Sequence, residues 1–303
     1  METSITSNGN SLDSSGTPAT FPLVYIVLLN WHGWWDTIAC LDSLARLNYP
    51  SYHILVVDNG STDDSVARIR DARPEVPILE TGKNLGFSGG CNVGIRQAIV
   101  EGADYVWLLN NDTVADPNAL QAMVEVAESA SDIGAVGSVL YYMDEPNKVQ
   151  AWGGGWVSFW TGRAGHHYGP VRNTSLDYLT AASILLRRSA LETVGLLDQE
   201  IFFMYWEDTD LSFRLSKSGW KLTVADQSKV FHKVSASFGK DSPRMDTYFN
   251  ESAVQFFRRY SPWPIWSISI ALVGRLTKRA LRGNSRGFVA TLRGAYAGWR
   301  KRQ

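Results

Sequence analysis

Short apolar runs of strand length alternate with amphipathic stretches through the first half of the chain. The apolar runs cover residues 23–29, 53–58, 76–80, 104–110 and 133–140. The stretches between them have helical spacing and cover residues 34–47, 63–72, 90–101 and 118–127. Near-continuous apolar strands that alternate with helices are typical of a parallel, doubly wound sheet covered on both faces. The pattern therefore predicts an α/β fold with a mostly parallel sheet flanked by helices.

These apolar runs lead into polar residues. The first run ends beside Asn30, the second ends in Asp58, the third leads to Asn84 and the fourth ends in Asn110. In open α/β sheets, ligands bind beyond the carboxyl ends of the strands. We therefore expect the four strand ends to meet at one binding site.

The pattern after residue 140 is less regular. Residues 151–170 are rich in aromatic side chains and glycine, which indicates irregular strands or loops around a binding surface. Farther on, the sequence predicts a strand and a short helix within residues 177–195, a helix ending at Gly219, two strands over 220–226 and 228–232, and a helix over 245–260.

The segment "VVDNGSTDDS" places Asp58 at a predicted strand end. A carboxylate there can accept the imide N–H of a uracil or thymine base, while the neighbouring Asn59 and Ser61 hold the ribose. The same residues also suit a turn, with Ser61 or Thr62 as N-cap of the next helix. Both interpretations fit this segment.

The segment "NLGFSGGCNVG", which begins at Asn84, is a glycine-rich entrance to a helix. Backbone N–H groups at such a helix start suit anionic ligands. Close packing of helix and sheet at Gly86, Gly89 and Gly90 explains the glycines equally well. The segment matches neither a Walker loop nor the dinucleotide fingerprint, which disfavours a dehydrogenase.

The segment "LLNNDT" has oxygen-bearing side chains that suit a hard divalent cation bound together with a diphosphate. Asp112 is the candidate ligand, and Asn110 can face sugar hydroxyls. His232, after the apolar residues "SKVF", is the candidate second ligand, although a lone histidine is also common as a surface or core residue. Imidazole among oxygen ligands favours manganese over magnesium, and both are compatible with the residues.

Three acids follow the aromatic segment "FFMYW". Glu207, Asp208 and Asp210 fall on the first turn of a predicted helix, where the helix dipole stabilises acids in any protein. Their place beside an apolar, aromatic segment also suits a general base that deprotonates an incoming hydroxyl.

Charge is distributed unevenly along the chain. Residues after Tyr260 include 9 Lys and Arg and no acid, whereas the preceding part has 20 basic against 30 acidic residues. Tryptophans and cations in this segment predict amphipathic helices lying in the headgroup plane of an anionic membrane, because its apolar run is too short to span one. Packing of these helices on the domain, or a contact in a homo-oligomer, remains an alternative. No motif supports nucleic acid binding.

The amino-terminal residues and the cysteines bear on location. Residues 1–20 are rich in Ser, Thr, Gly and Asn and are expected to form a disordered tail without a secretory signal. The chain has 2 cysteines, Cys40 and Cys91, both in helix-like patterns, so a reducing cytoplasm is expected rather than a disulfide.

Together these motifs resemble family 2 glycosyltransferases of the GT-A fold, in particular the bacterial branch of rhamnosyltransferases and related polysaccharide-assembly enzymes. The resemblance extends from Val24 to Tyr260. It rests on the ordered segments "VLLNW", "VVDNGSTDDS", "NLGFSGGCNVGI", "LLNNDT", "LTAASILLRR" and "WEDTDLSFR", followed by His232.

The resemblance implies a role for each motif. Asp112 corresponds to the metal-binding member of the Asp-x-Asp motif, which begins here with Asn110, and His232 to the downstream metal ligand. Asp208 corresponds to the catalytic base, and Glu207 would shape the acceptor site. Asp58 corresponds to the base-recognising carboxylate. The predicted nucleotide-binding residues are Asn30, Asp58, Asn59, Ser61, Asn84, Gly89, Asn110 and Asn111.

The implied activity is an inverting transfer of a sugar from a nucleotide sugar, with a divalent metal (Mn or Mg), to a hydroxyl of a lipid-linked or polysaccharide acceptor. The resemblance alone favours L-rhamnose from dTDP-rhamnose, and another UDP-sugar is an alternative. A catalytically silent nucleotide- or glycan-binding module is the alternative from a different class. A nucleotidyltransferase is disfavoured because no basic triphosphate loop is present. Residues 21–260 would form the catalytic domain and residues 261–303 a basic helical tail at the inner face of the plasma membrane.

Overall fold

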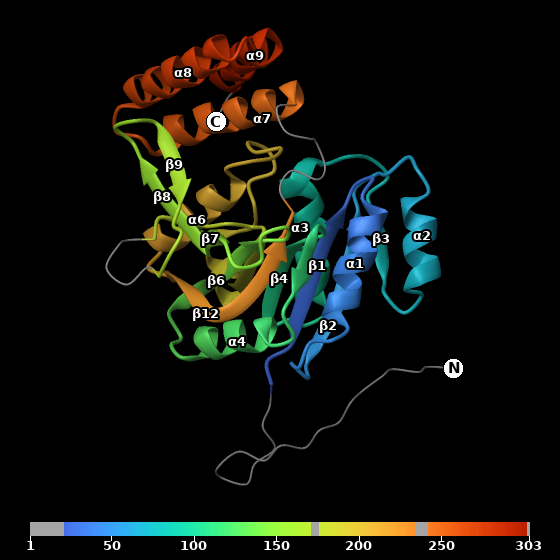
Figure 1. Ribbon diagram of the computed structural model, residues 1–303. Coiled ribbons are helices and arrows are strands. Elements are labelled where there is room, and N and C mark those ends of the chain that lie inside the picture. The colour runs from blue at the N-terminus through green and yellow to red at the C-terminus, as the bar shows by residue number, and fades with distance from the viewer. Residues whose placement is uncertain (1–20, 171–175, 234–241, 302–303) are drawn as a thin grey trace.

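One large mixed sheet forms the centre of the molecule. The computed structural model describes residues 21–170, 176–233 and 242–301, and within them nine strands join this sheet (Figure 1). The predicted disordered tail, residues 1–20, lies outside the described residues. The spatial order is β3-β2-β1-β4-β11-β6-β12-β5, and β7 pairs with β6. The bounds are β1 Val24–Asn30, β2 Tyr52–Asp58, β3 Ile78–Glu80, β4 Tyr105–Asn110, β5 Thr113–Ala115, β6 Ile133–Tyr142, β7 Val149–Trp152, β11 Ser183–Arg187 and β12 Lys221–His232.

Strand direction places several carboxyl ends at one edge of the sheet. Strands β1, β2, β3 and β4 are parallel, with Asn30 opposite Asp58 and Leu29 opposite Asn110. Strand β11 is antiparallel to both β4 and β6, so β6 runs in the same direction as β4. Strand β12 is parallel to β6 and ends with His232 opposite Tyr142. The mostly parallel sheet is therefore confirmed, and its carboxyl edge includes His232.

Two details of the strands differ from the prediction. The run over residues 220–232 is one strand, β12, rather than two, because an irregularity between Ala225 and Lys229 lets the ladder with β6 continue. The buried Ser228 within the irregularity donates a hydrogen bond to Ser138 of β6 at 2.9 Å. Strand β11 was predicted, but not its antiparallel direction, because a run buried on both faces carries no sign of direction.

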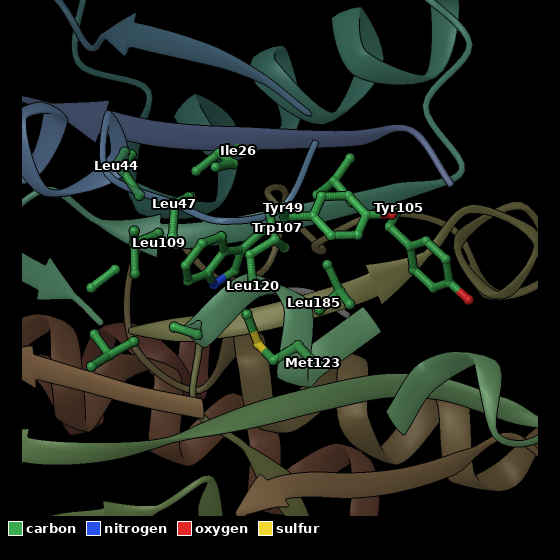
Figure 2. Packing of buried hydrophobic residues seen from close by; sticks show 14 of the residues in the cluster. Ile26, Leu44, Leu47, Tyr49, Tyr105, Trp107, Leu109, Leu120, Met123 and Leu185 are labelled. Carbon is green, nitrogen blue, oxygen red and sulfur yellow. The ribbon is translucent and has the colours of Figure 1, made fainter. Parts of the chain in front are cut away.

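Helices cover both faces of the sheet. Helices α1 (Trp34–Leu44), α2 (Ser65–Ala72) and α4 (Ala119–Glu128) contribute to the apolar cluster on one face. Helices α3 (Gly86–Val100), α5 (Arg188–Val194) and α6 (Glu207–Lys217) contribute to the cluster on the other. Figure 2 shows part of the first cluster, with the indole of Trp107 from β4 near Leu120 and Met123 from α4. The two layers hold the strand ends in fixed positions.

A small second sheet lies beside the carboxyl edge of the large one. Its strands are β8 (Gly154–Ser158), β9 (Arg163–His166) and β10 (Tyr178–Leu179), in the order β10-β8-β9. Gly154 permits the close pairing, because a Cβ there would lie 1.8 Å from the carbonyl oxygen of Tyr178. The aromatic, glycine-rich segment thus folds as irregular short strands, as its composition indicates.

Three helices complete the described chain: α7 (Pro243–Tyr260), α8 (Pro264–Leu281) and α9 (Ser285–Arg300). They lie together at one end of the molecule (Figure 1). Gly287 of α9 lies next to Asp246 of α7 and Gly298 next to Glu251, so these two helices run in the same direction. A third apolar cluster joins them to the domain, with Trp206, Phe256, Phe257, Ile268 and Ala295 among its members. Among the described residues, no helix is both long and apolar enough to cross a bilayer.

Candidate active site

A cavity of about 530 Å³ lies at the carboxyl edge of the large sheet. It is bounded by strand ends on one side and by the start of α6 and the first turn of α7 on the other. Eight predicted site residues line it: Asn59, Asn84, Asn110, Asn111, Asp112, Glu207, Asp208 and His232. Four others, Asn30, Asp58, Ser61 and Gly89, are not among its lining residues. Asp112 and Asp208, which stand far apart in the sequence, therefore face one shared space.

The carboxylate of Asp58 is enclosed by a hydrogen-bonded group that we call the Asp58 cluster: Asn30, Asp58 and Ser61. Its Oδ1 accepts hydrogen bonds from Asn30 Nδ2 at 2.7 Å and Ser61 Oγ at 2.6 Å, and its Oδ2 accepts one from Ser61 N at 2.9 Å. Asn30 and Asp58 are 0% and 2% exposed. The cluster joins the ends of β1 and β2 and leaves Asp58 acceptor capacity on Oδ2.

Ser61 and Thr62 do not cap the following helix. Helix α2 begins at Ser65 with Asp64 at the N-cap position, so this part of the prediction is wrong. Ser61 instead turns its hydroxyl back to Asp58 and accepts a hydrogen bond from His32 N at 3.0 Å. A serine beside a strand-end carboxylate finds a charged acceptor there, which is stronger than a neutral cap.

Asn59 connects the end of β2 to the start of α3. Its Nδ2 donates to the carbonyl oxygen of Gly86 at 2.9 Å, and its Oδ1 accepts from Leu85 N at 2.9 Å. Asn84 Oδ1 accepts from Gly86 N at 2.8 Å. Asn59, Asn84 and Gly86 all line the cavity, so the start of α3 opens into it.

The glycines of this segment serve mainly close packing. Helix α3 begins at Gly86, earlier than predicted, and Gly89 and Gly90 lie inside it. A Cβ on Gly90 would meet Leu29 Cδ1 at 2.4 Å, and one on Gly89 would meet Leu85 Cβ at 2.8 Å. Gly86 has φ +76° and packs against Phe203. The segment holds α3 against β1 and brings only its first turn to the cavity.

A histidine and an aspartate meet at the ends of β12 and β4. His232 Nε2 lies 3.3 Å from Asp112 Oδ1 and 3.3 Å from Asn110 Nδ2. On the other side of the ring, Nδ1 lies 2.7 Å from Gln150 Oε1. Because a carbonyl oxygen can only accept, Nδ1 is placed to donate to Gln150, and in the tautomer with the proton on Nδ1 the lone pair of Nε2 faces Asp112.

This arrangement fits a divalent cation. A ring-nitrogen lone pair and a carboxylate oxygen face each other at the cavity, and Gln150 fixes the tautomer that metal-bound histidines need. The described residues hold no group of three or more His, Cys, Asp or Glu side chains able to bind a metal. A cation here would therefore take its remaining ligands from water or from the oxygens of a bound diphosphate.

Glu207 and Asp208 begin helix α6 after a strained turn. Tyr205 and Trp206 both have φ +67°, which is unusual for residues with side chains. The turn directs Glu207 and Asp208 to the cavity and buries Trp206 among Phe249, Phe256 and Phe257. Two consecutive left-handed residues cost on the order of 1–3 kcal/mol each, which the aromatic packing offsets.

The two acids differ in their hydrogen bonds and in their pKa. Asp208 Oδ2 accepts from Ala181 N at 3.1 Å and its Oδ1 from Thr209 N at 2.6 Å, whereas the buried Oε2 of Glu207 has no partner among the described residues. Burial raises the pKa of Asp208, and these N–H groups limit the rise. Burial and then the neighbouring Asp208 raise the pKa of Glu207 well above its ordinary value. The pair therefore shares its charge unequally, with Asp208 the more acidic member.

Asp210, the third acid of the segment, is structural. It is fully buried, and its carboxylate accepts hydrogen bonds from Arg214 at 2.8 Å, Arg259 at 2.8 Å and Tyr260 at 2.7 Å. The pairing joins α6 to α7 and turns Asp210 away from the cavity, which it does not line.

Several cavity residues were not predicted individually. Gln150 comes from β7, His166 from the aromatic, glycine-rich part of the chain, and Phe203 and Tyr205 from the segment before α6. His166 lies near Asp208, and its Nδ1 is 3.0 Å from the Tyr178 hydroxyl. Burial lowers the pKa of His166, and the charge of Asp208 opposes this effect. The composition of residues 151–170 indicated a binding surface but not which side chains would face it.

Solved structures with a similar fold identify the fold class of this protein. A mannosyltransferase from Pyrobaculum calidifontis, solved with GDP-Man and Mn²⁺, has a TM-score of 0.59 and 16% identity, covering 92% of this chain and 86% of its own. GalNAc-T7, solved with UDP, GalNAc and Mn²⁺, has a TM-score of 0.65 and 13% identity, covering 90% of this chain and 53% of its own. The protein has the GT-A fold.

Sequence comparison supplies the family. The sequence model of glycosyl transferase family 2 matches residues 27–195, more than half of the chain, so the protein belongs to this family and is a glycosyltransferase. The match contains Asp58 and Asp112 and ends before Glu207, Asp208 and His232.

Two curated relatives are similar along most of the chain. The N-acetylglucosaminyl-diphospho-decaprenol L-rhamnosyltransferase of Mycobacterium tuberculosis is 28% identical over 277 residues, covering 81% of this chain and 90% of that protein. The O-antigen biosynthesis protein RfbC of Myxococcus xanthus is 28% identical over 242 residues, covering 74% of this chain but 18% of that protein.

Proposed function

We propose that the protein transfers a sugar from a nucleoside-diphosphate donor to a hydroxyl group of a lipid-linked glycan, with inversion at the anomeric carbon. The observation that carries this proposal is the shared cavity, which Asp112 and His232 border from the strand ends and Asp208 from α6. The side with Asp112 and His232 suits the diphosphate of a donor. The side with Asp208 supplies a base for the acceptor hydroxyl.

Asp208 is the proposed catalytic base. Its ionised carboxylate takes the proton of the acceptor hydroxyl while that oxygen forms a bond to the anomeric carbon, and the bond from this carbon to the diphosphate oxygen breaks. A single displacement of this kind inverts the anomeric configuration. The raised pKa of Asp208 brings the carboxylate closer in basicity to its task, and proximity in the cavity supplies much of the remaining rate.

Asp112 and His232 would hold a divalent cation, Mn²⁺ or Mg²⁺. A bound cation stabilises the negative charge that develops on a departing diphosphate. The facing lone pair and carboxylate support this assignment, and both solved neighbours contain Mn²⁺.

The proposed donor is dTDP-rhamnose. It rests on the mycobacterial relative named as an L-rhamnosyltransferase, and a UDP-sugar is the alternative because uracil and thymine present the same imide edge. The Asp58 cluster, with Asn59, Asn84, Asn110 and Asn111, would hold the nucleotide. Asp58 can act on the base only through its remaining acceptor position, so its main contribution is to fix Asn30 and Ser61.

The proposed acceptor is a polyprenyl-diphosphate-linked glycan at the cytoplasmic face of the plasma membrane, in cell-surface glycan synthesis. The name of the mycobacterial relative supports the lipid-linked acceptor, and the name of RfbC supports cell-surface glycan synthesis. In this proposal residues 21–260 carry the transfer chemistry and residues 261–303 make a peripheral membrane contact. Exposed apolar side chains on α8 support the contact, among them Ile265 (68% exposed) and Val273 (63% exposed), with Lys278 and Arg282 on the same helix and its cap.

The membrane contact can be tested with surface substitutions. Ile265→Ser with Val273→Ser is expected to reduce sedimentation with phosphatidylglycerol vesicles, because both side chains would lose their apolar burial. Val100→Ser is the control, since Val100 is 81% exposed on α3, on a different part of the molecule. Equal sedimentation of all three proteins would remove the contact from the proposal.

The activity can be tested with purified protein, Mn²⁺ and a short-chain polyprenyl-diphosphate N-acetylglucosamine. The donor panel is dTDP-rhamnose, several UDP-sugars and GDP-mannose, and NMR of the product gives its anomeric configuration. We expect one donor to react, with inversion. Binding of nucleotide sugars without any transfer would instead support a catalytically silent binding module, and retention would exclude single displacement.

A further inference from the structure

A second hollow lies beside the active-site cavity and has no part in the chemistry described above. It is a groove of about 470 Å³ between the first turns of α7 and the first half of α9. We call it the arginine groove. Its lining residues are Pro243, Arg244, Thr247, Ser285, Arg286, Val289, Ala290 and Arg293.

The arginine groove carries uncompensated positive charge. Arg244, Arg286 and Arg293 are exposed, and none has an ion-pair or hydrogen-bond partner among the described residues. The acid on the first turn of α7, Asp246, does not line the groove, and its Oδ1 is paired with Arg279 at 2.5 Å. No acid is among the lining residues of the groove, so its three guanidinium groups repel one another, and a bound anion relieves this repulsion.

Helix direction adds to the positive potential. Because α7 and α9 run in the same direction, both helices begin at the groove, at Pro243 and Ser285. The partial positive charge of each helix start then acts on the same space as the three arginines. Guanidinium groups bind phosphate oxygens in pairs of parallel hydrogen bonds, so the chemistry fits a phosphate or diphosphate better than a single carboxylate.

The groove adjoins the active-site cavity. Arg244 lines the groove and the next residue, Met245, lines the cavity, so the first turn of α7 borders both hollows. The Tyr248 ring on the same helix stacks on Phe203, a residue of the cavity wall, with ring centroids 4.9 Å apart. A molecule whose sugar lies beside Asp208 could extend past Met245 and place a charged group in the groove.

We propose that the arginine groove binds the diphosphate of the lipid-linked acceptor. This rests on the proposed function and assigns to Arg244, Arg286 and Arg293 the recognition of the acceptor, separately from the donor diphosphate at Asp112. The apolar Val289 and Ala290 then face the first carbons of the lipid chain.

Direct binding tests the groove without requiring transfer. The probe is a soluble short-chain prenyl diphosphate, measured by isothermal titration calorimetry with saturating nucleoside diphosphate and Mn²⁺ to fill the active-site cavity. We expect the full-length protein to bind the diphosphate but not the corresponding prenyl alcohol. Arg286→Gln and Arg293→Gln should each weaken binding roughly tenfold, the effect of losing one charged hydrogen bond.

Arg300→Gln is the matched control, because Arg300 is an exposed arginine on the same helix, seven residues beyond Arg293. It should bind the probe within about twofold of the unchanged protein, since a surface charge outside the groove acts only through screened, long-range attraction. Equal weakening by Arg300→Gln and Arg293→Gln, or no weakening by either groove variant, would overturn the proposal.

Kinetics and vesicles identify the source of the phosphate. With a diphosphate-linked acceptor, Arg293→Gln should raise the KM for the acceptor with little change in kcat or in the KM for the donor. Sedimentation with phosphatidylglycerol vesicles should be the same for Arg293→Gln and Arg300→Gln. A loss of sedimentation confined to Arg293→Gln would assign the groove to a lipid headgroup and overturn the acceptor assignment. Absence of transfer with every acceptor would refute the proposed function. The calorimetric result would still show whether the arginine groove binds a prenyl diphosphate.

Discussion

Asp58 and Asp208 are both carboxylates near the carboxyl edge of the large sheet, and their surroundings differ, because Asp208 lines the active-site cavity and Asp58 does not. Asp58 accepts three hydrogen bonds from Asn30 and Ser61 and is almost completely buried between two strand ends. Asp208 follows two left-handed residues, and its neighbour Glu207 has an unpartnered buried oxygen. A carboxylate held between two strand ends keeps those ends in place, whereas one that lines a cavity and has a raised pKa is suited to exchange a proton.

The largest effect is expected from Asp208→Asn. An amide cannot take the acceptor proton, so kcat should fall by about 10²- to 10⁴-fold while donor affinity stays unchanged. In the unchanged protein, activity should be lost as the pH falls through the raised pKa of Asp208, at a higher pH than for an ordinary aspartate. A pH profile of kcat/KM and donor titration of the variant check both statements. Full activity of Asp208→Asn would remove this residue from the mechanism.

Loss of the cation site should come next. Asp112→Asn, or removal of divalent metal with a chelator, should lower activity by about 10²-fold or more, because charge on the departing diphosphate would lose its main stabilisation. Added Mn²⁺ should restore the chelated protein but not the variant at the same concentration. Undiminished transfer in chelator would show that the facing Asp112 and His232 serve another purpose.

A substitution in the Asp58 cluster should lower both the stability of the protein and its affinity for the donor. Asp58→Asn removes the charge that holds Ser61 and turns one acceptor into a donor, so the free energy of unfolding should fall by about 1–3 kcal/mol. The KM for the donor should rise together with this loss. Chemical denaturation and donor kinetics are the measurements, with the more exposed Asp63→Asn as control. A rise in donor KM without loss of stability would show that Asp58 contacts the nucleotide directly.

The smallest effect is expected from Glu207→Gln, which keeps the shape of the side chain. Because the folded-state pKa of Glu207 is raised, its stabilising contribution is complete below the unfolded pKa of about 4.3 and is lost as pH rises toward the folded pKa. The variant removes this contribution, so its Tm should decline less between acidic and neutral pH than that of the unchanged protein. Thermal scans at matched pH values measure the difference. Parallel Tm profiles would mean that Glu207 is ionised in the folded protein.

The sequence anticipated the residues at the ends of the long strands better than Gln150 on the short strand β7. Asn110 and Asp112 were predictable because a buried run ends beside them, and parallel strands bring such ends together. His232 was predictable for the same reason, although β12 was expected as two pieces. Strand β7 pairs with its neighbour β6 and so brings Gln150 to His232, 82 residues farther along the chain, a contact that the apolar pattern does not reveal.

Glycines and hydroxyls were the least certain part of the prediction. The same residue types make a ligand loop, a turn or a close helix contact, and only the neighbours decide between these. Gly90 packs against Leu29, whose position depends on the alignment of β1 with β4. Ser61 bonds to Asp58 rather than to the start of α2 because the chain between β2 and α2 turns back first.

The packing of α9 against α7 limits how this enzyme can be shortened. Gln255, fully buried on α7, donates to the carbonyl oxygen of Gly298 at 2.7 Å, and the opposite side of α7 covers Trp206 in the turn before Asp208. A protein cut after Tyr260 would leave that amide in water and loosen the turn before Asp208, the proposed catalytic base. A more soluble version should therefore be made by substituting exposed residues on the last two helices while keeping their full length.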